Sequence, residues 1–175
     1  MTTKTTQGAA PGDLARLWEL GAGGELPEER RYADHIAAEL LRERLDSPLP
    51  MDPAQSDSLL VMVGGASVGL LPLAGRSLRE VLLDPHTGMA AIQPIKDYAK
   101  QLARRHRTGP EHEAAIGIYY TALAGALVYR GEKITAHGYD YLRDSFEQLL
   151  SKPWLPPEVA ELFRRARQVC SDRAE

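Results

Sequence analysis

The sequence predicts an all-α fold of six or seven helices, packed in an orthogonal or bundle-like manner around one central apolar helix. Three observations lead to this prediction. Residues 114–129 carry no charged side chain. Amphipathic segments with apolar residues at helical spacing lie on both sides of this stretch. Proline, glycine and capping signals separate the segments. A helix that is apolar all round has to be covered on several sides, so residues 114–130 are expected to form the centre of the fold.

The ends of the central helix carry their own signals. Thr108-Gly109-Pro110-Glu111 matches a capping box, in which the threonine hydroxyl accepts from a free amide and Glu111 reaches back. Gly131 can supply the left-handed residue that often follows a helix. Small residues recur at four-residue intervals between these ends, and they predict close packing within the domain, or else across a dimer: Gly117, Thr121 and Gly125.

Three other long segments have an apolar stripe at helical spacing. In residues 27–45 the predicted stripe is broad and runs over Tyr32, Ala33, Ile36, Ala37, Leu40 and Leu41. In residues 135–151 it runs over Tyr139, Leu142, Phe146, Leu149 and Leu150, and in residues 156–170 over Val159, Leu162, Phe163, Ala166 and Val169. Shorter helices are expected at 13–20 and 77–83. Each segment is therefore predicted to pack one face on the core.

Residues 85–107 contain a proline that complicates the pattern. Asp84-Pro85 is typical of a cap followed by proline at the first helical position. Pro94 cannot donate to the carbonyl four residues back, so a break is expected near Gln93. A regular helix is then predicted as far as Arg107, with these residues inward: Ile95, Ala99, Leu102 and His106.

The remaining segments are expected to be less regular. Two apolar runs flank Gly64-Gly65-Ala66-Ser67, so residues 59–72 are predicted to form either a small β-hairpin or an irregular buried segment. The small, polar residues 1–12 read as a flexible tail. Residues 13–175 are predicted to form a single helical domain.

Composition limits the class of protein. The chain has 175 residues, 43% of them apolar and 26% charged, with a net charge of −3, which is typical of one soluble domain with its own core. A single cysteine, Cys170, excludes an internal disulfide and a four-cysteine zinc site. No export signal is apparent, and the apolar stretches 59–73 and 114–129 are shorter than the roughly 20 residues that cross a bilayer. A soluble cytoplasmic protein without a membrane span is expected.

Motifs for catalysis or cofactors are weak. Gly65-Ala66-Ser67-Val68-Gly69 has the G-x-S-x-G spacing of a nucleophile elbow, but the glycines and proline that follow favour a glycine-rich turn. The five histidines include no H-E-x-x-H pair and no Glu-x-x-His pair. No phosphate-binding glycine motif opens a helix. We therefore predict no catalytic, cofactor-binding or metal-ligating residue.

A basic stripe is the most definite surface feature. Its members would share an arc of about 80° on a helix, at 100° per residue: Lys96, Lys100, Arg104 and Arg107. Such a stripe can contact a partner or follow phosphates. However, the chain is net acidic, and no aromatic residue lies within the stripe to stack on bases.

These observations favour a non-enzymatic helical protein-interaction module, either an adaptor or a regulatory subunit that binds a partner protein or itself. A first alternative is a nucleic-acid-associated protein that uses the basic stripe. A second is a hydrolase that uses Ser67 or a histidine-based metal site.

Overall fold

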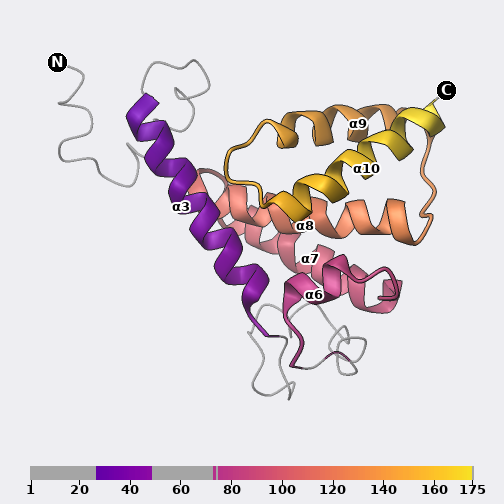
Figure 1. Cartoon of the computed structure of the whole chain (residues 1–175), viewed down its shortest axis with the longest axis horizontal. Coiled ribbons are helices and arrows are strands. Elements are labelled where there is room, and N and C mark those ends of the chain that lie inside the picture. Colours follow the sequence, from indigo (N-terminus) through magenta and orange to yellow (C-terminus); the bar gives the residue numbers. More distant parts are fainter. Residues whose placement is uncertain (1–26, 49–72, 74, 175) are drawn as a thin grey trace.

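The computed structural model describes residues 27–48, 73 and 75–174, which form six α-helices and no β-strand (Figure 1). An isolated antiparallel bridge joins Pro48 to Ser77. The prediction of an all-α fold is confirmed over these residues. The helices are α3 (Pro27–Asp46), α6 (Leu78–Leu83), α7 (Met89–Arg105), α8 (Gly109–Tyr129), α9 (Ala136–Leu150) and α10 (Pro157–Ala174).

Several expectations fall outside the described residues. The tail at 1–12, the helix at 13–20 and the hairpin or buried segment at 59–72 all belong to this group. Among the helices that are described, none is both long enough and apolar enough to cross a bilayer.

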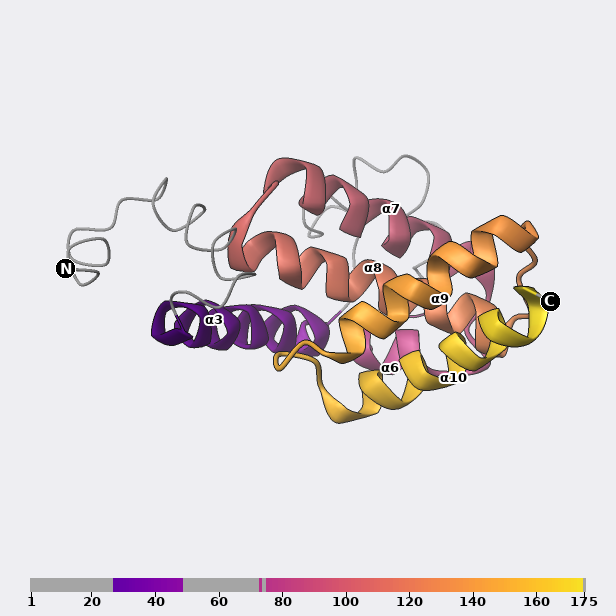
Figure 2. The same ribbon diagram turned by 90° about the horizontal axis from the view of Figure 1, so that it is seen from above.

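Helix α8 is the central helix, as its uncharged sequence predicts. It packs against α3, α6, α7 and α10, and Figures 1 and 2 show it running through the middle of the other helices. The side chains of Ala114, Ile118 and Ala122 are completely buried, and most of the others on this helix have little exposure. Because apolar residues surround α8, its burial on several sides removes them from water.

The capping box predicted at the start of α8 does not form, whereas the left-handed glycine predicted after its end is confirmed. Thr108 occupies the cap position but its side chain accepts no capping hydrogen bond. Glu111 instead pairs with Arg44 of α3, with 3.2 Å between Nη2 and Oε2. A cross-helix cation thus competes successfully for the carboxylate. At the other end, Gly131 has a φ of +64°, the left-handed geometry that favours glycine.

The small residues of α8 pack within the chain. A Cβ at Gly117 would lie 3.0 Å from Leu41 of α3 and 3.2 Å from the ring of Trp154. A Cβ at Gly125 would lie 3.3 Å from the carbonyl oxygen of Leu82 in α6. The absence of side chains therefore lets α3 and α6 approach the central helix closely, which is the first of the two explanations that the sequence offered.

Helix α7 differs from its prediction at three points. It begins at Met89, because Asp84 organises a turn instead of a helix: its carboxylate accepts from the amide of His86 at 2.8 Å. The helix continues through Pro94, which is buried. Proline there withholds a single amide and its ring gains burial in the core. The helix ends at Arg105, two residues before the expected end, and His106 is its half-buried cap residue.

The other amphipathic helices bury the predicted faces with small differences. Tyr32 of α3 is wrongly placed by the sequence pattern, since it is 62% exposed, and the buried stripe is narrower: Ala33, Ala37, Leu41 and Leu45. In α9 the buried residues are Tyr139, Leu142, Phe146 and Leu149, and in α10 they are Val159, Leu162, Phe163, Ala166 and Cys170. One cluster of buried apolar side chains includes members of all six described helices.

Candidate functional site

A cleft of about 510 Å³ opens between α7 and α8. These helices run side by side in opposite directions, joined by the short connection 106–108 (Figure 2). The volume lies within the range of about 300–1,000 Å³ that is usual for ligand pockets. We call it the cationic cleft, and its lining residues are Ala99, Lys100, Ala103, Arg104, Arg107, His112, Ile116, Tyr119 and Tyr120.

One wall of the cleft carries three cations. Lys100 and Arg104 are four residues apart on α7 and therefore lie on the same side of it, while Arg107 belongs to the connection. All three side chains are exposed. No acidic residue is among those that line the cleft, and within the described residues none of the three forms an ion pair.

The nearby carboxylates are engaged elsewhere. Glu111 pairs with Arg44, and Glu113 lies 3.8 Å from Lys152 on the side of α8 that faces the α9–α10 connection. Asp97 accepts a hydrogen bond from Gln93 at 3.3 Å. None of these acids lines the cleft, although the charges of Asp97 and Glu132 act on Tyr119 in its wall. Because none of them pairs with Lys100, Arg104 or Arg107, the cations would attract an anion.

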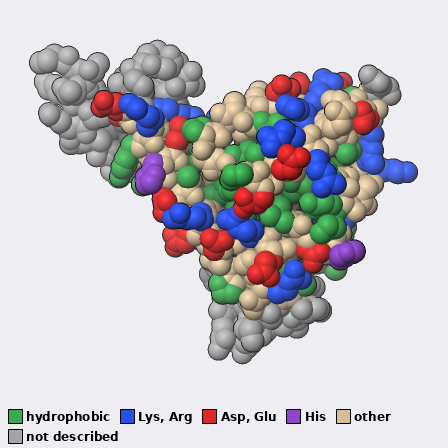
Figure 3. All heavy atoms as spheres, in the orientation of Figure 1, with side chains coloured by type: hydrophobic (Ala, Val, Ile, Leu, Met, Phe, Trp, Pro, Cys, Tyr) green, Lys and Arg blue, Asp and Glu red, His purple; other side chains and the backbone are tan. Residues whose placement is uncertain are grey.

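Away from the cleft, the pattern of charge is different. On the face seen in Figure 3, acidic and basic side chains are interspersed over α3, α9 and α10. Pairs within single helices are typical there, such as Arg164 with Glu161 at 2.8 Å and Arg143 with Asp140 at 3.1 Å. Charges of both signs on neighbouring turns form a solvated, self-neutralising surface, which does not select an anionic ligand.

His112 anchors one end of the cleft. Its Nδ1 lies 2.8 Å from the carbonyl oxygen of His106 and 3.3 Å from that of Ala103. Carbonyl oxygens only accept hydrogen bonds, so Nδ1 carries the proton and donates it. The ring thereby ties the start of α8 to the last turn of α7 and holds the two walls together. The Nδ1 atom of His112 is thus engaged with the backbone of α7 and of the connection that follows it.

Tyrosines form the wall that faces the cations. The rings of Tyr119 and Tyr120 meet edge to face with centroids 5.3 Å apart, and Tyr120 meets Phe146 of α9 in the same way at 5.7 Å. Burial is the main cause that raises the pKa of both phenols above the ordinary value of 10.0. Both phenols therefore stay neutral in ordinary buffers. The hydroxyl of Tyr120 is already hydrogen-bonded to Ser145 and Tyr141 of α9, so Tyr119 is the tyrosine whose hydroxyl can donate to an anion.

The tyrosines correct an expectation from the sequence. No aromatic residue interrupts the basic stripe within α7, but α8 brings two of them to the same cleft. A signal for this was available, because a three-residue connection makes two helices antiparallel neighbours, and residues equally far from the turn then meet. By this count Ile116 faces Tyr98, which is next to Ala99, and Tyr119 and Tyr120 follow about one turn later.

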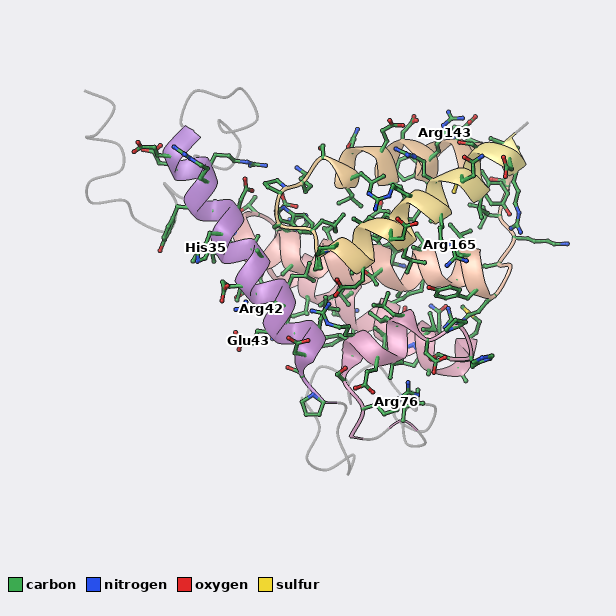
Figure 4. The ribbon with its side chains drawn as sticks, viewed as in Figure 1. His35, Arg42, Glu43, Arg76, Arg143 and Arg165 are labelled. Carbon is green, nitrogen blue, oxygen red and sulfur yellow. The ribbon has the colours of Figure 1, made fainter. Side chains whose placement is uncertain are left out.

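Three of the four residues predicted to contact a partner lie together in the cleft. Lys100, Arg104 and Arg107 line the cleft, whereas Lys96 is half-buried and is not among its lining residues. Ser67 lies outside the described residues. His35 lies on the outer side of α3 (Figure 4), and no group of three or more potential metal ligands occurs in the described parts of the chain.

Comparisons of the chain with protein-family models, with curated proteins and with solved structures found no match. The chemistry of the cleft is therefore what bears on function. Among the described lining residues are cations, phenols, a histidine and small apolar side chains, but no carboxylate, serine or cysteine. Such a set can hold an anion that has an apolar part.

Proposed function

We propose that the protein is a non-enzymatic helical interaction module, an adaptor or regulatory subunit, and that it binds an anionic partner in the cationic cleft. In this proposal, the described helices belong to a single bundle-like domain that holds the walls of the cleft in place. The observation that carries the proposal is the group formed by Lys100, Arg104 and Arg107, three exposed cations that have no acidic partner among the described residues. Unpaired charge of one sign beside an apolar floor favours a partner of opposite sign.

Binding to a labelled poly-glutamate peptide, followed by fluorescence polarisation at low salt, tests this proposal. Replacing Lys100 and Arg104 together with glutamate is expected to weaken binding about tenfold or more, because both attractive charges become repulsive. Binding by the unmodified protein should also weaken as salt is raised, since mobile ions screen exposed charges.

The matched control is the double substitution Arg164→Glu with Arg167→Glu on α10. It changes the net charge by the same amount, and its two side chains also lie on one helix. Both arginines pair with acids outside the cleft, Arg164 with Glu161 and Arg167 with Glu147. If the control weakened binding as much as the cleft variant, or if no polyanion bound, the cleft would not be the binding surface.

A nucleic-acid-associated role is the second candidate, and the presence of Tyr119 and Tyr120 beside the cations favours it. Single-stranded binding sites combine basic grooves with aromatic rings on which bases stack. In this cleft both rings are half-buried and meet each other edge to face. This arrangement presents less open ring surface than a stacking platform needs, so we rank this role second. A labelled oligothymidylate in the same polarisation experiment measures it directly.

A further inference from the structure

The floor of the cationic cleft is apolar, and most of its side chains are small. Ala99 and Ala103 contribute single methyl groups from α7, and Ile116 contributes the larger side chain from α8. Ala99 is completely buried, while Ala103 and Ile116 are half-buried. Small side chains allow a neighbouring backbone to approach α7 closely, as at other helix–helix contacts.

Two of the cations beside this floor are one helical turn apart. Lys100 and Arg104 are four residues apart on α7, whereas Arg107 lies beyond the end of α7, in the connection to α8. Residues four apart on any α-helix have Cβ atoms separated by about 5–6 Å. A second helix placed along α7 would therefore bring acids four residues apart into register with Lys100 and Arg104.

The size of the cleft indicates how such a helix would bind. Its volume of about 510 Å³ exceeds that of one side chain but is too small to enclose a helix. One apolar anchor would enter between Ala103 and Ile116, against Tyr119 and Tyr120. The helix body would then rest on the rim, where the cations lie. Amphipathic helices commonly bind grooves in this way, with their anchors on one face.

From this geometry we infer that the partner bound by the cationic cleft is an acidic amphipathic helix of another protein. Its carboxylates, four residues apart, pair with Lys100 and Arg104, and an apolar side chain between them fills the floor. This inference rests on the proposed function, because it specifies the partner for the same cleft. The mostly apolar floor and the half-buried tyrosines favour this occupant over a nucleic acid, which would require exposed ring faces.

Four synthetic helical peptides test the inference by fluorescence polarisation. The first has glutamates four residues apart on one side of a leucine anchor. The second has glutamine in place of the glutamates, the third has serine in place of leucine, and the fourth has the same composition with its glutamates distributed around the helix. The first is expected to bind about tenfold or more tightly than each of the others, because only it matches charge, spacing and floor together.

Two variants of the protein and one control variant test whether the first peptide binds in the cleft. The variant with Lys100→Glu and Arg104→Glu should no longer bind the first peptide. It should instead bind a peptide that carries lysine at the glutamate positions, since the exchange of charges restores attraction. Ala103→Leu should fill the floor and weaken the first peptide, whereas Ala160→Leu, at a half-buried position on α10 outside the cleft, should leave it unchanged. A variant that does not fold would fail with both peptides, so the swapped preference excludes this explanation.

The outcomes separate this inference from the proposal on which it rests. If poly-glutamate binds and responds to the charge reversal, but the four peptides bind alike or the oligothymidylate binds most tightly, the acidic-helix partner is overturned and the anion-binding cleft remains. If neither poly-glutamate nor any peptide binds, both are overturned. Tight binding of the first peptide with the expected swap supports both.

Discussion

Cys170 is a buried thiol on α10, and its environment makes its ionisation depend on folding. Its side chain is completely buried. Burial raises the pKa of the Cys170 thiol from an ordinary value of 9.0 to about 11, although nearby Arg173 and Arg143 act in the opposite direction. Desolvation is larger than these attractions because the thiolate would have to enter an apolar environment. The thiol is therefore a small apolar core residue at neutral pH.

This shift predicts a loss of stability at high pH. Between pH 9 and pH 11 the unfolded chain releases the Cys170 proton while the folded chain retains it. The unfolded state then binds fewer protons, so the free energy of unfolding falls as pH rises. Cys170→Ala should remove this part of the decrease, on the order of 2 kcal/mol. Urea denaturation of both proteins at the two ends of the window measures the difference.

Comparison with the alanine variant removes other effects from this measurement. The buried volume lost in Cys170→Ala lowers stability by an amount that does not depend on pH, and the lysines and tyrosines titrate in both proteins. Equal decreases for the two proteins across the window would contradict the assigned pKa. In the native protein, the same burial predicts slow reaction of Cys170 with a thiol reagent until the chain is unfolded.

Among the helices and their connections, the end of α8 is held by one arginine. Arg130 donates from Nε to the carbonyl oxygen of Thr87, and from Nη2 to that of Asp84 at 3.1 Å. These carbonyls belong to the connection between α6 and α7. Gly125 makes room for the guanidinium, since a Cβ there would lie 2.9 Å from Nη1. The arginine therefore connects the central helix to a turn that it does not otherwise contact through hydrogen bonds in the described residues.

Replacement of Arg130 with glutamine is predicted to lower the free energy of unfolding by about 1–3 kcal/mol, because it leaves carbonyls in a partly buried turn without donors. Arg165→Gln is the matched comparison. Arg165 lies on α10 (Figure 4) with its guanidinium 5.3 Å from the ring of Tyr129, which Arg130 also approaches at 5.9 Å. Its loss should cost about 1 kcal/mol or less. Denaturation curves that showed equal losses would contradict the role given to the Arg130 hydrogen bonds.

Elements differ in how well the sequence predicts them, and the reason is the range of the interactions involved. Thr135 caps α9 through its own hydroxyl, which accepts from the amide of Gly138 at 3.0 Å, so a local pattern suffices. Thr108 belongs to an equally good local pattern, yet Glu111 is taken by Arg44, 67 residues away. Asp84 likewise orders a turn where proline at 85 suggested a helix start. Competing partners from distant or alternative contacts decide such cases.

For the molecule as a whole, one buried cluster includes residues of all six described helices. Leu41 of α3 is completely buried where it meets α8, and Trp154 is buried beside the same contact. A shared core predicts one cooperative unfolding transition, because no described helix can leave without exposing part of it. This expectation follows from the domain predicted for residues 13–175.

Two probes test this cooperativity. Trp18→Phe leaves Trp154 as the sole tryptophan. Its fluorescence and the far-ultraviolet circular dichroism are predicted to change together during urea denaturation. Leu41→Ala should lower the free energy of unfolding by about 2–5 kcal/mol, because it leaves a cavity at the contact of α3 with α8. Both probes should report the same decrease. Separate transitions for the two probes would show that the described helices do not unfold as one unit.

The sequence by itself determined that the described chain is helical, that its uncharged stretch forms the central helix, and which faces of α9 and α10 are buried. These properties follow from the spacing of apolar residues along one helix, which is a local pattern. Only the tertiary structure decided that Lys100, Arg104 and Arg107 share a cleft with two tyrosines, and that Glu111 is drawn away to Arg44. Such meetings depend on the register and angle at which helices pack, and these are set by the fit of side chains that lie far apart in the sequence.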